Sequence, residues 1–140
     1  SREVARLRAA DLGVGAVASF VGTVRERSPR PDEGQGVSLL ELEAQAEVDK
    51  FAVCTLLRWG LNAGRWAGSL MGRLFERVAL RPNLSEPERW RYLEANRLAK
   101  TYCARLLPMV RSGHMDKLLA ELRHAYRLGA DAKLQYFARR

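Results

Sequence analysis

The amino-acid sequence predicts an all-α fold, a single-domain helical bundle of about five or six helices over residues 1–140. Apolar residues recur at intervals of three and four through most of the chain, which is the period of a helix face. Two Ser-x-x-Glu boxes mark helix starts, and glycine or proline stands where the helical pattern stops. A length of 140 residues suits one domain with one core.

The N-terminal quarter predicts two helices and a loop. Residues 1–12 place Val4 and Leu7 on one face, which indicates a short helix ending before Gly13. In residues 14–24, valines and a phenylalanine follow the helical spacing, so a helix is favoured over a strand. Residues 28–37 begin with SPRPDEGQG, whose two prolines and two glycines offer little to bury, so we expect a mobile loop.

Two strings in this region, GAVASFVGTVRE (15–26) and VSLLELEA (37–44), resemble the start of the large subunit of molybdopterin synthase. In that family a similar segment forms strands. The resemblance covers about thirty residues, and the family's later histidine-arginine segment and lysine-rich C-terminal end have no counterpart here, because residues 80–140 follow a helical pattern. No activity, cofactor or residue role is carried over from it.

The next segment begins at a capping box and contains a regular row of glycines. Ser38 and Glu41 form the box, and apolar residues continue without a proline as far as Arg81. The sequence predicts one long glycine-containing helix here, with two helices joined near residues 60–64 as the alternative. Four glycines fall at every fourth position, and each costs a helix about 1 kcal/mol relative to alanine. These are Gly60, Gly64, Gly68 and Gly72.

Three interpretations of the glycine row remain open. In the first, it forms a close-packing helix face with Trp59 and Trp66 on the opposite side, and another backbone approaches it. In the second, a nucleic-acid backbone approaches, since arginines such as Arg65 and Arg73 flank the row. In the third, a Gly-Asn-Gly turn joins two helices and the other glycines are incidental.

Three further helices follow. Ser85 and Glu88 form a second capping box, and the apolar stripe that starts there is expected to kink or end at Pro108. Residues 115–126 form the clearest amphipathic pattern in the chain. After Gly129, we expect Asp131 to cap a last short helix.

The charge of the chain is large and unevenly distributed. Lys plus Arg number 24 against 16 for Asp plus Glu, which gives a net charge of +8 and an isoelectric point near 10.2. Residues 51–140 hold 17 basic and 7 acidic residues, whereas residues 31–50 are acidic. Such a balance favours a polyanionic partner. A high arginine content from genome composition or heat adaptation would account for the same numbers.

The leading hypothesis is a non-catalytic nucleic-acid-binding protein, or a small subunit of a nucleoprotein complex, with single-stranded nucleic acid or RNA favoured. The expected phosphate contacts are Arg97, Lys100, Arg105, Arg111, Arg123 and Arg127. The alternative is an interaction module that docks on an acidic protein, such as a transcription or replication component. Most of the aromatic residues between these arginines fall on apolar stripes and are expected in the core. They are Trp90, Tyr92, Tyr102, Tyr126 and Tyr136.

No enzyme, metal or membrane signature stands out. His114 and His124 lack ligand partners at metal-site spacing, and the pair Glu43 and Glu47 is expected to be a solvated face, so no cofactor is predicted. The two cysteines lie in apolar helical stretches, which predicts buried reduced thiols. With no apolar run of about 20 residues and no visible signal peptide, we expect a cytoplasmic protein.

Overall fold

The computed structural model describes residues 38–60 and 63–140, which contain helices and no strand. The elements are α2 (Leu39–Leu57), α3 (Ala63–Met71), a π-helical turn η1 (Gly72–Glu76), α4 (Glu86–Arg111), α5 (Met115–Tyr126) and α6 (Ala130–Ala138). The predicted all-α bundle is therefore confirmed. The helices expected in residues 1–12 and 14–24, and the loop at 28–37, lie outside the described residues.

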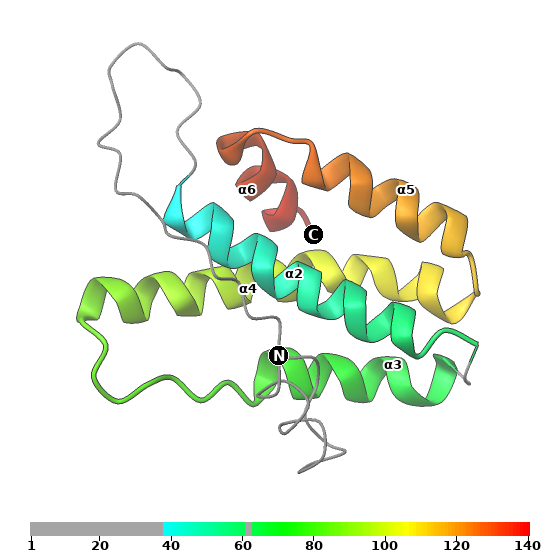
Figure 1. Ribbon diagram of the computed structural model, residues 1–140, viewed down its shortest axis with the longest axis horizontal. Helices are drawn as coiled ribbons and strands as arrows, with labels where there is room; N and C mark the ends of the chain where they lie inside the picture. The colour runs from blue at the N-terminus through cyan, green and yellow to red at the C-terminus, as the bar shows by residue number, and fades with distance from the viewer. Residues whose placement is uncertain (1–37, 61–62) are drawn as a thin grey trace, which may run out of the picture.

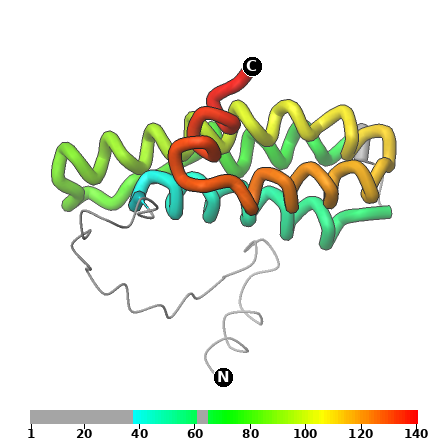
Figure 2. Tube along the Cα trace, turned by 90° about the horizontal axis from the view of Figure 1, so that it is seen from above, coloured from blue at the N-terminus to red at the C-terminus, as the bar shows by residue number. Residues whose placement is uncertain are grey.

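Helix α4 is the centre of the bundle. It packs against α2, α3, α5 and α6, and Tyr102 and Leu106 on it are fully buried with Phe51 of α2 and Phe137 of α6. Figure 1 shows α2, α3, α4 and α5 running back and forth, with the α2–α3 and α4–α5 connections at the same end of the bundle. Figure 2 shows the same arrangement from above, with α6 turning away from the direction of the other helices.

The two capping boxes have different outcomes. At Ser85 the box is complete, because the Ser85 hydroxyl accepts from the Glu88 amide at 3.3 Å and the Glu88 carboxylate accepts from the Ser85 amide at 2.8 Å. At Ser38 only the first half forms: the hydroxyl accepts from the Glu41 amide at 3.1 Å. The Glu41 carboxylate instead accepts a 2.6 Å hydrogen bond from Lys133 on α6, and both side chains are buried.

The prediction of one long glycine-containing helix after Ser38 is wrong, because the structure has two helices there, as the alternative predicted. Helix α2 ends at Leu57, and the backbone of Gly60 has a φ of +91°, a conformation that residues with a Cβ rarely adopt. A glycine in the left-handed conformation commonly ends a helix, because this backbone conformation is not strained in a residue that lacks a Cβ. Helix α3 then begins at Ala63, so Gly60 is separated from the three other glycines of the row.

The expectations at two other helix ends have different outcomes. Pro108 does not end α4, which runs three residues further to Arg111 and stops just before Gly113, a stop that the sequence also indicates and whose φ is +72°. The Ser112 amide and hydroxyl both donate to the Pro108 carbonyl, at 3.0 Å and 2.7 Å, and close the last turn. Asp131 is not the cap of α6, because the helix begins at Ala130 and Gly129 occupies the cap position. The Asp131 carboxylate lies in the first turn, where the positive end of the helix dipole stabilises its negative charge.

Helix α2 carries apolar residues on two sides. One side supplies Ala44, Val48 and Phe51 to the core. The other side, hereafter the outer face of α2, is exposed, and it consists of Leu39, Leu42, Val53, Leu56 and Leu57. A helix that is apolar all round is normally covered on all sides. Nothing in the described residues covers the outer face.

Candidate nucleic-acid interface

The structure does not bring the six predicted phosphate contacts together on one face. Arg97 and Lys100 lie exposed on α4, but each is engaged by an acid. Arg97 donates two hydrogen bonds, of 2.6 and 2.8 Å, to Glu94, and this bond lowers the pKa of the Glu94 carboxyl. Lys100 lies 3.2 Å from a carboxylate oxygen of Glu76. Their charge is therefore partly neutralised within the protein.

Arg105 is part of the packing between helices. Its Nη2 donates a 2.6 Å hydrogen bond to the Tyr136 carbonyl, which ties α6 to α4. The guanidinium carbon also lies over the rings of Tyr102 and Tyr136, 5.2 Å and 5.1 Å from their centres. Because the fork of Arg105 is engaged in this way, the structure gives it a packing role that its place in the sequence did not indicate.

Arg123 and Arg127 lie exposed on α5 at a shallow groove between α5 and α2. The groove has a volume of about 460 Å³ and is also lined by Gln45 and Asp49 of α2. Gln45 donates to Asp49 at 2.8 Å. An acid therefore faces the two arginines across the groove, which weakens the attraction that this groove offers to a phosphate.

Arg111 differs from the other five predicted phosphate contacts because its side chain lies close to Gly68, a member of the glycine row. It is the last residue of α4, it is exposed, and a Cβ placed on Gly68 of α3 would lie 3.8 Å from its Nη2. Arg65 on α3 and Arg73 on η1 are both exposed and lie near Gly68 in sequence. None of these three arginines is ion-paired with a carboxylate among the described residues. We call Arg65, Arg73 and Arg111, with Gly68, the α3 basic surface.

Gly68 of α3 and Gly72 of η1 are not in close contact with another backbone in the described part of the chain. The nearest side-chain atom to a Cβ on Gly68 belongs to Arg111, and the nearest to a Cβ on Gly72 is a Glu76 oxygen at 3.6 Å, within the η1 turn. Gly68 is exposed. Of the three interpretations, the helix break agrees with the third, and the approach of a nucleic-acid backbone stays a prediction.

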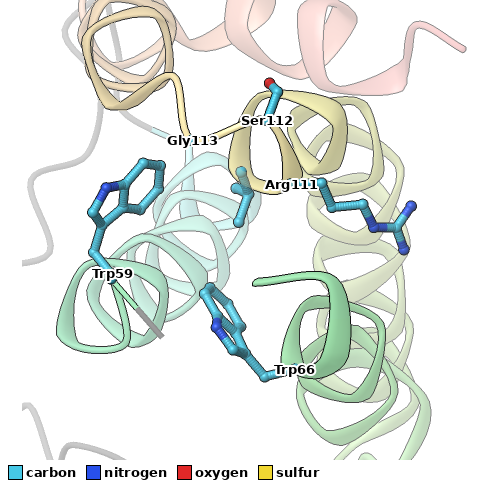
Figure 3. A pocket seen from close by; sticks show the side chains of 7 residues that line it. Trp59, Trp66, Arg111, Ser112 and Gly113 are labelled. Atoms are coloured by element: carbon cyan, nitrogen blue, oxygen red, sulfur yellow. The ribbon is translucent and has the colours of Figure 1, made fainter. Parts of the chain in front are cut away.

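A pocket lies beside the α3 basic surface, at the end of the bundle that holds both helix connections. Its volume is about 260 Å³, and we call it the tryptophan pocket. Figure 3 shows the indoles of Trp59, in the turn after α2, and Trp66, on α3, at one space, while the Arg111 guanidinium points away from it. The lining residues are Trp59, Gly60, Trp66, Val110, Arg111, Ser112 and Gly113.

The sequence did not reveal this pocket. Trp59 and Trp66 are seven residues apart, which on one continuous helix would place both on the same side. The chain reverses between them instead, so that both border the same space from different elements. Only one lining residue, Arg111, is charged. The Trp66 Nε1 donor is buried and has no hydrogen-bond partner among the described residues.

The expectation that most aromatic residues between the basic residues belong to the core is wrong. Tyr102 is fully buried and Tyr136 partly so, but Trp90, Tyr92 and Tyr126 are 61%, 40% and 64% exposed. Trp90 and Tyr92 lie near the start of α4, where the helix is joined to α2 by Arg91 and Glu43 while these two rings stay exposed.

Glu43, Glu47 and His114 each have a polar partner among the described residues. Glu43 accepts two 2.9 Å hydrogen bonds from Arg91, and Glu47 pairs with Lys50, so the acids of α2 bridge to basic residues. The His114 ring lies 2.7 Å from the Ser112 hydroxyl. Residues 38–60 and 63–140 contain no group of three or more potential metal ligands. None of the described helices combines the length and apolarity that crossing a membrane requires.

Comparison with protein-family models, curated proteins and solved structures finds no match to this chain. The resemblance to molybdopterin synthase therefore has no support from a family match. The second resembling string, VSLLELEA, also differs from that family in structure, because residues 39–44 belong to helix α2 and not to a strand. The functional argument rests on the geometry of the described residues.

Proposed function

We propose that the protein binds single-stranded nucleic acid without catalysis, alone or as a small subunit of a nucleoprotein complex. The α3 basic surface is the observation that carries this proposal. It combines three exposed arginines that have no carboxylate partner in the described residues with the bare backbone of Gly68. Phosphate binding needs free cationic side chains beside a surface that does not obstruct the strand.

The charges around this surface support the same partner. Residues 51–140 carry 17 basic and 7 acidic residues. Of those acids, Glu76 and Glu94 are ion-paired with lysine and arginine side chains on α4. Arginine suits phosphate better than lysine does, because its planar fork donates two parallel hydrogen bonds. The adjoining tryptophan pocket favours a strand with unpaired bases over a duplex.

Fluorescence anisotropy of labelled single-stranded RNA, single-stranded DNA and duplex DNA at two salt concentrations tests the proposal. Three phosphate contacts on a single strand predict a slope of log affinity against log salt of about −2, so a fourfold rise in salt weakens binding about 20-fold. Absence of binding to all three polymers would refute the proposal.

A pair of charge reversals locates the surface. The double variant Arg65→Glu/Arg111→Glu is expected to abolish binding while leaving the circular dichroism spectrum unchanged. The matched control is Arg97→Glu/Lys100→Glu, which changes the net charge equally at residues already paired with acids. If both variants lose affinity equally, the effect comes from overall charge and the α3 basic surface is not the site.

A protein-interaction module is the second candidate, and the outer face of α2 favours it. Five exposed aliphatic residues on one helix side, with Leu57 74% exposed, form the kind of patch that marks a protein contact. This candidate predicts no affinity for oligonucleotides and a complex with a partner protein, such as an acidic one, in size-exclusion chromatography.

A further inference from the structure

We infer that the tryptophan pocket receives one unpaired nucleobase of the bound strand, stacked against an indole ring. The inference rests on the proposed function and deepens it, because it assigns the base to a place separate from the phosphate contacts. Three features of the pocket support it: its shape, its unpaired hydrogen-bond donor and the distribution of charge around it.

The shape suits a flat ring. Trp59, in the turn after α2, and Trp66, on α3, border the same space (Figure 3), and Val110 of α4 also lines it. A volume of about 260 Å³ is slightly below the ~300–1,000 Å³ of pockets that hold drug-sized ligands, so a single planar ring system fills it. Every nucleobase has a π face that stacks on an aromatic side chain, which makes such a site tolerant of sequence.

The buried donor favours a base over an apolar side chain. Trp66 Nε1 is buried without a partner in the described residues. Because this atom is not accessible from the open pocket, the Trp66 ring has to turn slightly for the donor to reach an acceptor there. A buried donor that finds no acceptor is unfavourable, whereas a new hydrogen bond offsets its lost contact with water. The ring nitrogens and carbonyl oxygens of nucleobases are acceptors. The side chains of leucine or phenylalanine would fill the space and leave the donor unsatisfied.

The charges place the phosphates outside the pocket. Arg111 is the one charged residue among those that line it, and its guanidinium points away from the indoles and lies next to Gly68. Among the described residues no carboxylate lines the space, so none of them repels a nucleotide there. A strand with one base between the indoles would therefore continue over α3, where Arg65 and Arg111 are available to its phosphates.

Indole fluorescence provides the test. In a Trp90→Phe background, which removes the exposed tryptophan of α4, the signal comes from Trp59 and Trp66 alone. Titration with a single-stranded RNA heptamer is expected to quench this signal, and duplex RNA is expected to quench it much less. Adding Trp59→Ala should remove most of the quenching and weaken binding of the heptamer about tenfold, the usual effect of losing one stacked base.

Two further measurements keep the outcomes separate. Trp66→Phe keeps an aromatic ring but loses the donor and part of the stacking area, so it should weaken heptamer binding less than Trp59→Ala does. Its melting temperature is measured alongside, because Trp66 packs against the core. If both variants bind the heptamer as the background protein does, the pocket inference fails while the proposed function stands. If no polymer binds, both fail. Quenching by N-acetyl-phenylalaninamide in the absence of quenching by AMP would assign the pocket to a protein side chain and overturn the inference.

Discussion

Replacing Lys133 with methionine tests the contact that joins the two ends of the described chain. Lys133 Nζ lies 2.6 Å from Glu41 Oε1, and the two side chains are only 5% and 9% exposed. Methionine retains the apolar stem of lysine but leaves the Glu41 carboxylate buried without its cation. The partner is 92 residues away along the chain, so no local contact replaces it.

Removal of one member of a buried ion pair costs about 3–5 kcal/mol, because an uncompensated charge stays in the interior. Glu41 lies in the first turn of α2, where the helix dipole stabilises a carboxylate by about 0.3–1 kcal/mol. We therefore expect a loss at the lower end of that range, about 3 kcal/mol. For a domain of this size the melting temperature should fall by about 10 °C.

Urea unfolding followed by circular dichroism measures this loss. With a slope of about 1.5 kcal/mol per molar urea, the midpoint should move down by about 2 M. Lys50→Met is the matched control, because the Lys50–Glu47 pair is exposed and such pairs contribute about 0–1 kcal/mol. The double variant Glu41→Leu/Lys133→Met should recover most of the stability, since it removes both charges. A loss below about 1 kcal/mol in Lys133→Met, or no recovery in the double variant, would refute the reasoning.

Three other predictions concern single side chains. Burial raises the pKa of the Cys103 thiol, so iodoacetamide should alkylate Cys54 first, and equal labelling of the native protein by mass spectrometry would contradict the packing. Burial also raises the pKa of Tyr102, so stability should be full below about pH 10 and should fall at higher pH, less steeply in Tyr102→Phe, as followed by thermal melts. Gly113→Ala should destabilise by about 1 kcal/mol because its φ is +72°. Gly129→Ala, with free space and an ordinary φ of −64°, should be neutral in the same denaturation assay.

The parts of the fold that local chemistry determines could be predicted from the sequence. The Ser85–Glu88 box forms because both partners are three residues apart, and α5 follows a clear helical period. The end of α2 could not be placed, because apolar residues lie on both of its sides and its stripe runs on without a visible stop. The left-handed conformation of Gly60 depends on tertiary packing, and a row of evenly spaced glycines does not indicate which one adopts it.

The types of residue at the candidate site could be predicted from the sequence, but their positions relative to one another could not. The sequence identified Arg111 and Gly68 as members of two separate features, and the fold places them in contact. Which basic residues are neutralised depends on contacts between elements, as between Lys100 and Glu76. The tryptophan pocket exists only because the chain reverses between its two indoles. The interval between two tryptophans in the sequence does not reveal such a reversal.

The position of the tryptophan pocket has a mechanical consequence. Its walls come from two helical hairpins, α2–α3 and α4–α5, whose turns contain Gly60 and Gly113. Hairpins of this kind open locally at their ends before a domain unfolds as a whole. A ligand seated between them acts as a crosslink, because neither hairpin can open without releasing it. Occupancy should then slow amide hydrogen exchange in both turns at once, although they lie about 50 residues apart in the chain.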